Sequence, residues 1–354
     1  MSHHTPICCI VPEEILCRMA DQPEHRARAL RTLILTERLR GRRVVLQRLG
    51  ASATSTGQKR RTVYDAQHGT TLPGKLVRSE GAAATADVAV NEAYDFCGAT
   101  YDFYMKAYSR NSIDDKGMRL DSSVHYDQDY DNAFWDGQQM VYGDGDGTIF
   151  DRFTKCLDVV GHELTHGVTA ATANLNYEGP SGALNESISD VFGSMVKQMS
   201  NNQTADQADW LIGEGLFLPS VNGVALRSMK APGTAYDDPQ LGKDPQPGDM
   251  SGYVNTSSDQ GGVHTNSGIP NHAFYLIAVE IGGFSWERAG RIWYEALTKR
   301  LTSSSDFQAA ADATFGAAGD LYGVGSDEQK AVSGGWSGVG IKVNASAAGK
   351  KPVR

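Results

Sequence analysis

Cysteine is scarce in this chain, and long apolar runs are absent. Five of the 354 residues are cysteine, and three of them, Cys8, Cys9 and Cys17, lie near the N-terminus. An odd and uneven set of this kind does not predict a disulfide framework, and it fits folding in a reducing compartment. A transmembrane helix needs about 20 consecutive apolar residues, and no such run occurs. The sequence therefore predicts neither a disulfide-stabilised nor a membrane-spanning protein.

The N-terminal segment also lacks the features of a secretory signal peptide. It has no basic lead, and Pro12, Glu13 and Glu14 interrupt its apolar stretch. Export would therefore need another route. The location stays open between secretion by a non-classical route and the cytoplasm.

Charge is divided unevenly along the chain. The formal net charge is −9, yet residues 1–50 contain nine arginines, no lysine and five acids, a net charge of +4. The remaining 304 residues then carry −13, so the basic head and the acidic body are expected to attract each other. Nucleic acid is not an expected partner, because the basic segment is short, lacks aromatic residues and is followed by a body that would repel phosphates.

Residues 160–166 contain the most informative pattern, two histidines four apart with a glutamate directly after the first. On a helix, residues i and i+4 share one face, so His162 and His166 can reach one metal ion. Glu163 follows about 100° further round the helix, beside the metal, where a base acting on water would stand. The pattern alone arises by chance in roughly one chain per hundred of this size, so other residues must support it.

A second helix is predicted downstream, where apolar residues recur with helical spacing at Leu184, Ile188 and Val191. Glu186 and Asp190 are four residues apart and share another face of it. A catalytic zinc ion takes three protein ligands, so we interpret Glu186 as the third ligand. Asp190 would accept the free ring N–H of a liganding histidine, His162. The alternative for both acids is a solvated acidic face.

These segments together resemble the thermolysin family of zinc metalloendopeptidases. Further similar segments follow in the family's order from about Val63 onward, at residues 132–135, 142–147, 226–229 and 261–268. Residues 10–16 resemble the protealysin branch, which has a short propeptide. The resemblance implies an α+β fold with two lobes, in which a β-rich N-terminal lobe, a central zinc-binding helix and a mainly helical C-terminal lobe surround a cleft.

The resemblance also implies roles for further residues. Glu163 would take a proton from the attacking water and deliver it to the leaving amine. Tyr177 and His264 would stabilise the oxyanion, and Asp259 would orient the His264 ring. Each has an ordinary alternative: a half-buried aromatic for Tyr177, a satisfied imidazole for His264 and a turn residue for Asp259.

Substrate binding is implied at two places. Arg227 and the backbone of Asn132 and Ala133 would hold an extended peptide by strand addition, although Arg227 has an alternative as a plain ion-pair residue. A preference for a bulky hydrophobic residue after the scissile bond follows if apolar side chains converge beside the zinc ion; they are Val159, Leu226, Phe150, Phe153, Ile212 and Leu216. The alternative for this group is ordinary core packing.

Zinc is the cofactor that the resemblance implies. Calcium, which family members often bind, is doubtful because Lys197 and Leu211 stand where acidic ligands are expected. Lys197 is expected to pair with the acids that remain, which are Asp158, Asp209 and Glu214. A thiolate of Cys8 or Cys9 on the open zinc position is a further hypothesis, and buried packing is the commoner role of a free cysteine.

The chain divides into five predicted segments. Residues 1–50 form a basic helical propeptide bound to the catalytic domain, and residues 51–61 form a linker with the processing site. Residues 62–176 form the N-terminal lobe with the HExxH helix, residues 177–345 the helical lobe, and residues 346–354 a disordered tail. The alternative for the first segment is a helical subdomain that stays attached.

Two helices are expected in the propeptide, over residues 10–20 and 21–40, with Asp21 capping the second and Gly41 ending it. The second would carry an apolar stripe of Leu30, Leu33, Ile34 and Leu39. In the body, strands are expected over 122–126 and 139–142, and helices over 87–108, 158–173, 182–200, 268–281, 286–301 and 305–318.

Three functions are compatible with these residues. The first is a zinc endopeptidase made as a zymogen, which acts on proteins or peptides as a monomer and needs neither nucleic acid nor membrane. The second is a zinc aminopeptidase with the same ligands, which would need an acidic subsite that we do not find. The third is an inactive zinc-binding interaction protein, against which the complete set of predicted catalytic residues argues.

Overall fold

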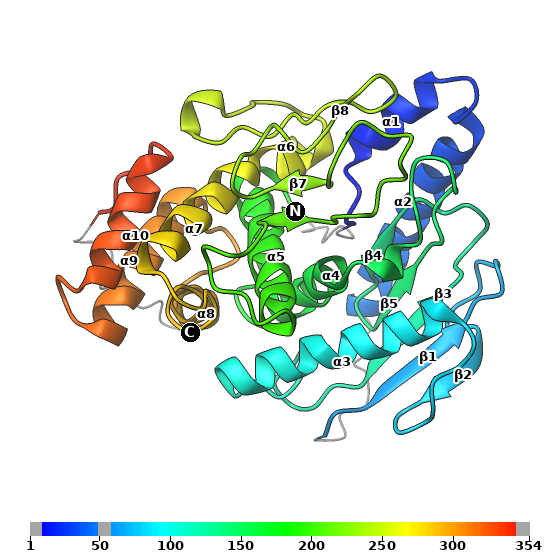
Figure 1. The fold of residues 1–354 in the computed structure, drawn as a ribbon, viewed down its shortest axis with the longest axis horizontal. Coiled ribbons are helices and arrows are strands. Elements are labelled where there is room, and N and C mark those ends of the chain that lie inside the picture. The colour runs from blue at the N-terminus through cyan, green and yellow to red at the C-terminus, as the bar shows by residue number, and fades with distance from the viewer. Residues whose placement is uncertain (1–8, 49–57, 345–354) are drawn as a thin grey trace. The chain divides into compact units, whose positions relative to one another are not determined.

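The computed structural model describes residues 9–48 and 58–344, which form two compact units. Unit 1 contains the chain up to Gly167 with Gly213–Leu226 and Tyr236–Lys243, and unit 2 contains Val168–Ile212, Arg227–Ala235 and the chain from Asp244 onward. Figure 1 labels their elements. Among the described residues, no helix combines the length and the apolar character needed to cross a membrane. The predicted tail and most of the predicted linker lie outside the described residues.

A five-stranded mixed sheet organises unit 1, in the order β2-β1-β3-β5-β4. Its strands are β1 (Arg61–Asp65), β2 (Lys75–Ser79), β3 (Leu120–Val124), β4 (Ala133–Trp135) and β5 (Gln139–Tyr142). The strand predicted over 139–142 is confirmed, the one predicted over 122–126 begins and ends two residues earlier, and β4 was not predicted. β1, β3 and β5 run parallel, whereas β2 and β4 are antiparallel to their neighbours. The carboxyl ends of β1, β3 and β5 therefore meet at one edge of the sheet.

Helix α3 (Val88–Tyr108) lies along this sheet and contacts β1 and β3 (Figure 1). It begins where the sequence predicts, because one carboxylate oxygen of Asp87 accepts the backbone N–H groups of Ala89 and Val90. It ends at Ser109, whose φ of 57° is left-handed. Helix α4 (Leu157–Ala170) carries the HExxH pattern, and η1 (Phe153–Lys155) precedes it.

The predicted propeptide contains two helices, α1 (Glu13–Asp21) and α2 (Arg26–Arg48). The predicted boundaries between and after them are wrong: Asp21 ends α1 instead of capping α2, and α2 continues past Gly41. A single glycine inside a helix costs only about 1 kcal/mol, which the other residues of a long helix can offset. The predicted stripe is also displaced, since Leu30 and Ile34 are exposed. The buried residues of α2 are Ala29, Thr32, Leu35, Thr36 and Leu39, and His25, directly before the helix, is also buried.

That buried face packs on the end of the sheet in unit 1. Leu35 and Leu39 share a core cluster with Cys9 and with residues of the body, Ala66, Tyr126, Tyr130, Phe134 and Val141. Cys9 thus occupies a packed apolar site, and Cys8 lies outside the described residues. Ion pairs surround the cluster: Arg31 binds both carboxylate oxygens of Asp127 at 2.6 and 2.5 Å, and Arg28 lies 3.6 Å from Asp146. These ion pairs join the basic N-terminal segment to acidic residues of the rest of the chain, as the uneven charge predicts.

Unit 2 is mainly helical, as predicted (Figure 1). The helix predicted over 268–281 is confirmed at both ends, and three others are confirmed with shifts of two to four residues. Two short helices, α6 and α10, were not predicted. The helices are α5 (Gly179–Ser200), α6 (Asp259–Asn266), α7 (Gly268–Ile281), α8 (Ala289–Lys299), α9 (Phe307–Tyr322) and α10 (Asp327–Gly338). The short elements β6 (Leu211–Ile212), β7 (Arg227–Ser228) and η2 (Met250–Gly252) belong to unit 2, and β8 (Asp237–Asp238) and β9 (Gly242–Lys243) to unit 1.

Candidate active site and metal centre

The two histidines of α4 point at each other across one helical turn. Their Nε2 atoms lie 2.9 Å apart, the ring centroids are 4.6 Å apart, and both rings are buried. Helical periodicity alone produces this convergence, because residues four apart lie one above the other. Two buried ring nitrogens at this separation can bind the same small cation.

Neighbouring contacts determine which face of α4 presents these rings. The Thr165 hydroxyl binds Tyr104 of α3 at 2.8 Å and the carbonyl of Gly161 at 2.7 Å. Gly167 lies so close to Ile113 that a Cβ there would come within 2.6 Å of its Cγ2. Any larger residue at 167 would push the helix away from its support and displace the imidazole pair.

Glu163 is fully buried, and its carboxylate is held by the edge strand β4. Its Oε2 accepts the backbone N–H of Trp135 at 3.1 Å. An N–H donor of this kind stabilises the ionised carboxylate. Sequence reasoning did not find this role of Trp135, because a backbone donor leaves no signature in residue type.

A second group of predicted residues meets in unit 2. The Tyr177 hydroxyl donates to Glu186 Oε1 and lies 3.3 Å from His264 Nε2. His264 Nε2 is 3.5 Å from Glu186 Oε2. On the other side of the ring, His264 Nδ1 is 2.6 Å from Asp259 Oδ1, and Asp259 Oδ2 accepts the backbone N–H of His264. Four residues that the resemblance implied are thus in one hydrogen-bonded network.

An unusual backbone places Asp259 under the His264 ring. Four consecutive residues, 259 to 262, have positive φ between 47° and 86°. Gly261 and Gly262 adopt such angles without steric cost, whereas Asp259 and Gln260 do so at some expense. The strained turn brings a carboxylate back to a residue five positions later, which a regular helix would not do.

The charge on His264 is set by opposing effects. Burial lowers the pKa of His264, but the carboxylates of Asp259 and Glu186 raise it more, to about 9. In this arrangement the imidazole is protonated at neutral pH, and its Nε2–H can donate.

Asp190 and Arg227 form a buried ion pair. Asp190 accepts Nε of Arg227 at 2.9 Å and Nη2 at 2.8 Å, and it also accepts the side-chain amide of Asn271 at 2.8 Å. Burial would lower the pKa of Arg227, but Asp190, Glu186 and Tyr177 outweigh it and raise that pKa above its usual value. The sequence named both members of this pair but predicted neither their pairing nor the part of Asn271.

The three predicted metal ligands are each buried, His162 and His166 on α4 in unit 1 and Glu186 on α5 in unit 2. Two imidazole nitrogens and one carboxylate oxygen suit zinc, which binds nitrogen and oxygen donors at about 2.0–2.2 Å. The predicted ligands are therefore a chemically fitting set.

The positions expected to bind calcium are engaged otherwise. Lys197 Nζ lies 2.8 Å from Asp209 Oδ2, which confirms the predicted pairing for that acid. Asp158 accepts the backbone N–H groups of Val159 and Gly213 at 2.9 and 3.1 Å.

The two residues predicted to hold substrate, Asn132 and Ala133, bind the N-terminal segment. The N–H of Ile10 donates to the carbonyl of Ala133 at 3.3 Å, and the N–H of Val11 donates to Asn132 Oδ1 at 3.1 Å. Cys9 forms an antiparallel bridge with Phe134. The apolar residues Val159 and Leu226 are buried, as are Phe150, Phe153, Ile212 and Leu216.

Comparison with known proteins agrees with this geometry. Two family models match, the catalytic domain of thermolysin metallopeptidase over residues 45–170 and its alpha-helical domain over residues 173–341. An extracellular metalloprotease of Pectobacterium carotovorum subsp. carotovorum is 51% identical over 345 residues, which are 96% of this chain and 97% of that protein. Protease PrtS of Photorhabdus sp. (strain Az29) is 52% identical over 286 residues, which are 80% of this chain and 76% of that protein.

A solved structure extends the comparison to the propeptide. The precursor of protealysin, a metalloproteinase from Serratia proteamaculans, matches with a TM-score of 0.86 and 51% identity, over 94% of this chain and 99% of that one. This match includes the N-terminal segment as well as both matched domains. The chain therefore belongs to the thermolysin family of zinc metalloendopeptidases, in its protealysin-like branch.

Proposed function

We propose that this chain is the zymogen of a zinc endopeptidase in which His162, His166 and Glu186 hold the catalytic metal. The buried pair of His162 and His166 ring nitrogens on α4, 2.9 Å apart, carries this proposal, and the buried carboxylate of Glu186 would complete the ligand set. Structural zinc sites are closed by four protein ligands, whereas catalytic sites keep one position open, as thermolysin itself does with two histidines and one glutamate. Zinc, when bound, lowers the pKa of water toward about 7 and polarises a carbonyl.

Glu163 is the proposed general base. It follows His162 directly on α4, and the Trp135 N–H fixes its carboxylate. It would remove a proton from the attacking water and later transfer it to the amine that leaves, which supplies typically 10²–10⁴-fold of the rate.

Tyr177 and His264 are the proposed donors to the developing oxyanion. Both bear a polar hydrogen beside Glu186, and Asp259 keeps the His264 ring oriented and charged. Removing one such donor in other enzymes costs about 10²–10³ in kcat.

Arg227 and Asp190 are proposed to act together. Asp190 holds the Arg227 guanidinium in one orientation, from which it would bind a substrate carbonyl, and Asp190 would also accept a ring N–H of His162. The apolar side chains of Val159 and Leu226 are proposed to favour a bulky hydrophobic residue after the scissile bond.

Residues 9–11 are proposed to take the place of substrate in the zymogen. They bind the carbonyl of Ala133 and the side chain of Asn132, the two residues whose backbone would hold an extended peptide. Substrate then gains access only after the propeptide leaves. Since one similar protein is named as extracellular, we propose that the mature enzyme acts outside the cell and as a monomer.

The test is hydrolysis of casein and of a peptide with a blocked N-terminus, measured on processed enzyme. A zinc chelator should abolish both activities, and the first equivalent of zinc should restore them. An aminopeptidase would spare the blocked peptide, and an inactive binding protein would bind zinc without cleaving either substrate. Either of these results would contradict the proposal.

Calcium is expected to contribute little to stability. Because Lys197 already neutralises Asp209 and a hard divalent ion requires six to eight oxygen ligands, millimolar calcium should leave the melting temperature of the processed enzyme unchanged within about 1 °C. Differential scanning fluorimetry in calcium and in EGTA measures this. A rise of several degrees in calcium would show that an ion site has formed despite the lysine.

A further inference from the structure

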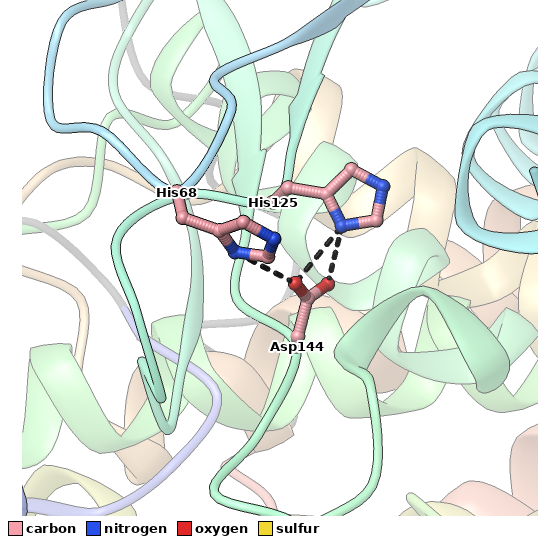
Figure 2. Close-up of side chains that lie close together, drawn as sticks. All are labelled: His68, His125 and Asp144. Carbon is pink, nitrogen blue, oxygen red and sulfur yellow. Dashed lines mark hydrogen bonds and ion pairs between the residues drawn. The ribbon is translucent and has the colours of Figure 1, made fainter.

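A second group of potential metal ligands lies at the carboxyl edge of the parallel strands in unit 1. His68 follows β1, His125 directly follows β3, and Asp144 follows β5. Their ligand atoms all lie within 4.8 Å of one another. Figure 2 shows the Asp144 carboxylate between the two imidazole rings, with both rings turned toward it. Ligands commonly bind at this edge of parallel sheets, because the loops there diverge.

The distances describe a compact three-residue site. His125 Nδ1 lies 2.9 Å from both oxygens of Asp144, and His68 Nδ1 lies 3.5 Å from Asp144 Oδ2. The ring centroids of the two histidines are 5.5 Å apart. Exposure increases across the group, with 19% of the His125 side chain, 27% of Asp144 and 60% of His68 accessible. Solvent can therefore reach the site and fill a fourth position.

The backbone holds both histidines in a conformation that side chains seldom adopt. φ is 56° at His68 and 54° at His125, and their main chains are joined by a hydrogen bond of 2.9 Å from His68 N to His125 O. Left-handed backbone at residues other than glycine is costly and concentrates at functional sites. Here it turns two imidazoles from different strand ends toward one carboxylate.

Asp87 supplies the outer support that metal-binding histidines usually have. Its Oδ2 lies 2.8 Å from His125 Nε2, while its Oδ1 caps α3. When Nδ1 gives up its proton to bind a metal ion, a carboxylate on Nε2 holds the other proton there and orients the ring.

We propose that His68, His125 and Asp144 form a second zinc-binding site, with Asp87 as the positioning residue. Two imidazoles and one carboxylate favour a borderline transition ion over calcium or magnesium, which prefer oxygen ligands. The site joins the ends of three strands, so an ion bound there stabilises unit 1. This inference is independent of the proposed catalytic metal, because the two groups share no residue.

The test measures zinc binding to the full-length chain by equilibrium dialysis after metal removal, in a Glu163→Gln background that prevents self-cleavage. Two equivalents are expected for this parent, and one for His68→Gln and for Asp144→Asn. Asp87→Asn keeps an oxygen that can cap α3 but loses the charge, and it should weaken the second equivalent about 10- to 100-fold. His272→Gln, which replaces another partly buried histidine, is the matched control and should retain two.

A thermal measurement separates loss of the site from loss of folding. The second equivalent of zinc should raise the melting temperature of the parent, and this rise should disappear in His68→Gln, whose exposed side chain can be replaced without disturbing packing. A parent that binds one equivalent and keeps it in His68→Gln, or a His68→Gln variant that still binds two, would overturn the proposal. A parent that binds one equivalent and loses it in His68→Gln would instead contradict the catalytic ligand set.

Discussion

Replacing Glu163 by glutamine is expected to reduce kcat on a peptide substrate by at least about 10²–10⁴-fold while zinc content stays the same. Glutamine has nearly the same shape but cannot accept a proton. It can still accept the Trp135 N–H through its amide oxygen, so the fold of the helix should be maintained. Stopped-time hydrolysis of a blocked fluorogenic peptide, with zinc measured by atomic absorption, provides both numbers.

The result for Glu163→Gln is to be compared with that for a second variant, Glu186→Gln. If Glu186 is a ligand, its amide variant should lose zinc as well as activity, because a neutral amide is a far poorer zinc ligand than a carboxylate. The two variants thus distinguish a general base from a metal ligand. Activity of Glu163→Gln within a factor of ten of wild type would exclude the proposed mechanism.

Replacing Val11 by proline is expected to make the intact zymogen active before processing. Proline removes the N–H that donates to Asn132 Oδ1. That oxygen keeps the backbone N–H of Ala133, so the loss is that of one hydrogen bond, about 0.5–1.5 kcal/mol, or roughly 2- to 12-fold in propeptide occupancy. Activity of the uncleaved chain on a small peptide should rise by that factor. Electrophoresis of the same samples confirms that the chain is still intact.

Val11→Ala is the control for this prediction, since it trims the side chain but keeps the backbone donor. It should leave latency close to that of the wild type. If Val11→Pro stays as latent as Val11→Ala, the 9–11 segment does not block substrate, and inhibition must come from α1 or α2. If the linker is cleaved in either sample, the assay time must be shortened, because cleavage itself would activate the enzyme.

Prediction from sequence succeeded where the deciding forces are local. The HExxH spacing implied that two rings face one another, and the Nε2 atoms lie 2.9 Å apart. The extent of α3, to within one residue, and the full extent of α7 were also predicted, because apolar periodicity acts within a few residues. The roles of Tyr177, His264 and Asp259 came from resemblance alone, and the structure places these residues in one network.

Errors arose where distant parts of the chain compete with local signals. Gly41 looked like a helix end, but α2 continues to Arg48. The apolar stripe of α2 was assigned to Leu30 and Ile34, whereas the face that meets Tyr126 and Tyr130 is a different one. Which face of a helix becomes buried depends on the surface that it packs against. A short stretch of sequence does not contain that surface.

The residue types and spacings of this chain were sufficient to predict its candidate site residues: two imidazoles and a carboxylate on one helix, and a second carboxylate on the next. Tertiary structure alone decided which partners these groups have. Asp190 meets Arg227 from 37 residues away, Val11 meets Asn132 from 121 residues away, and His68, His125 and Asp144 meet only because β1, β3 and β5 run parallel. Hydrogen bonds and metal coordination depend on positions in space to within a few tenths of an ångström, and for residues so far apart only the packed fold determines those positions.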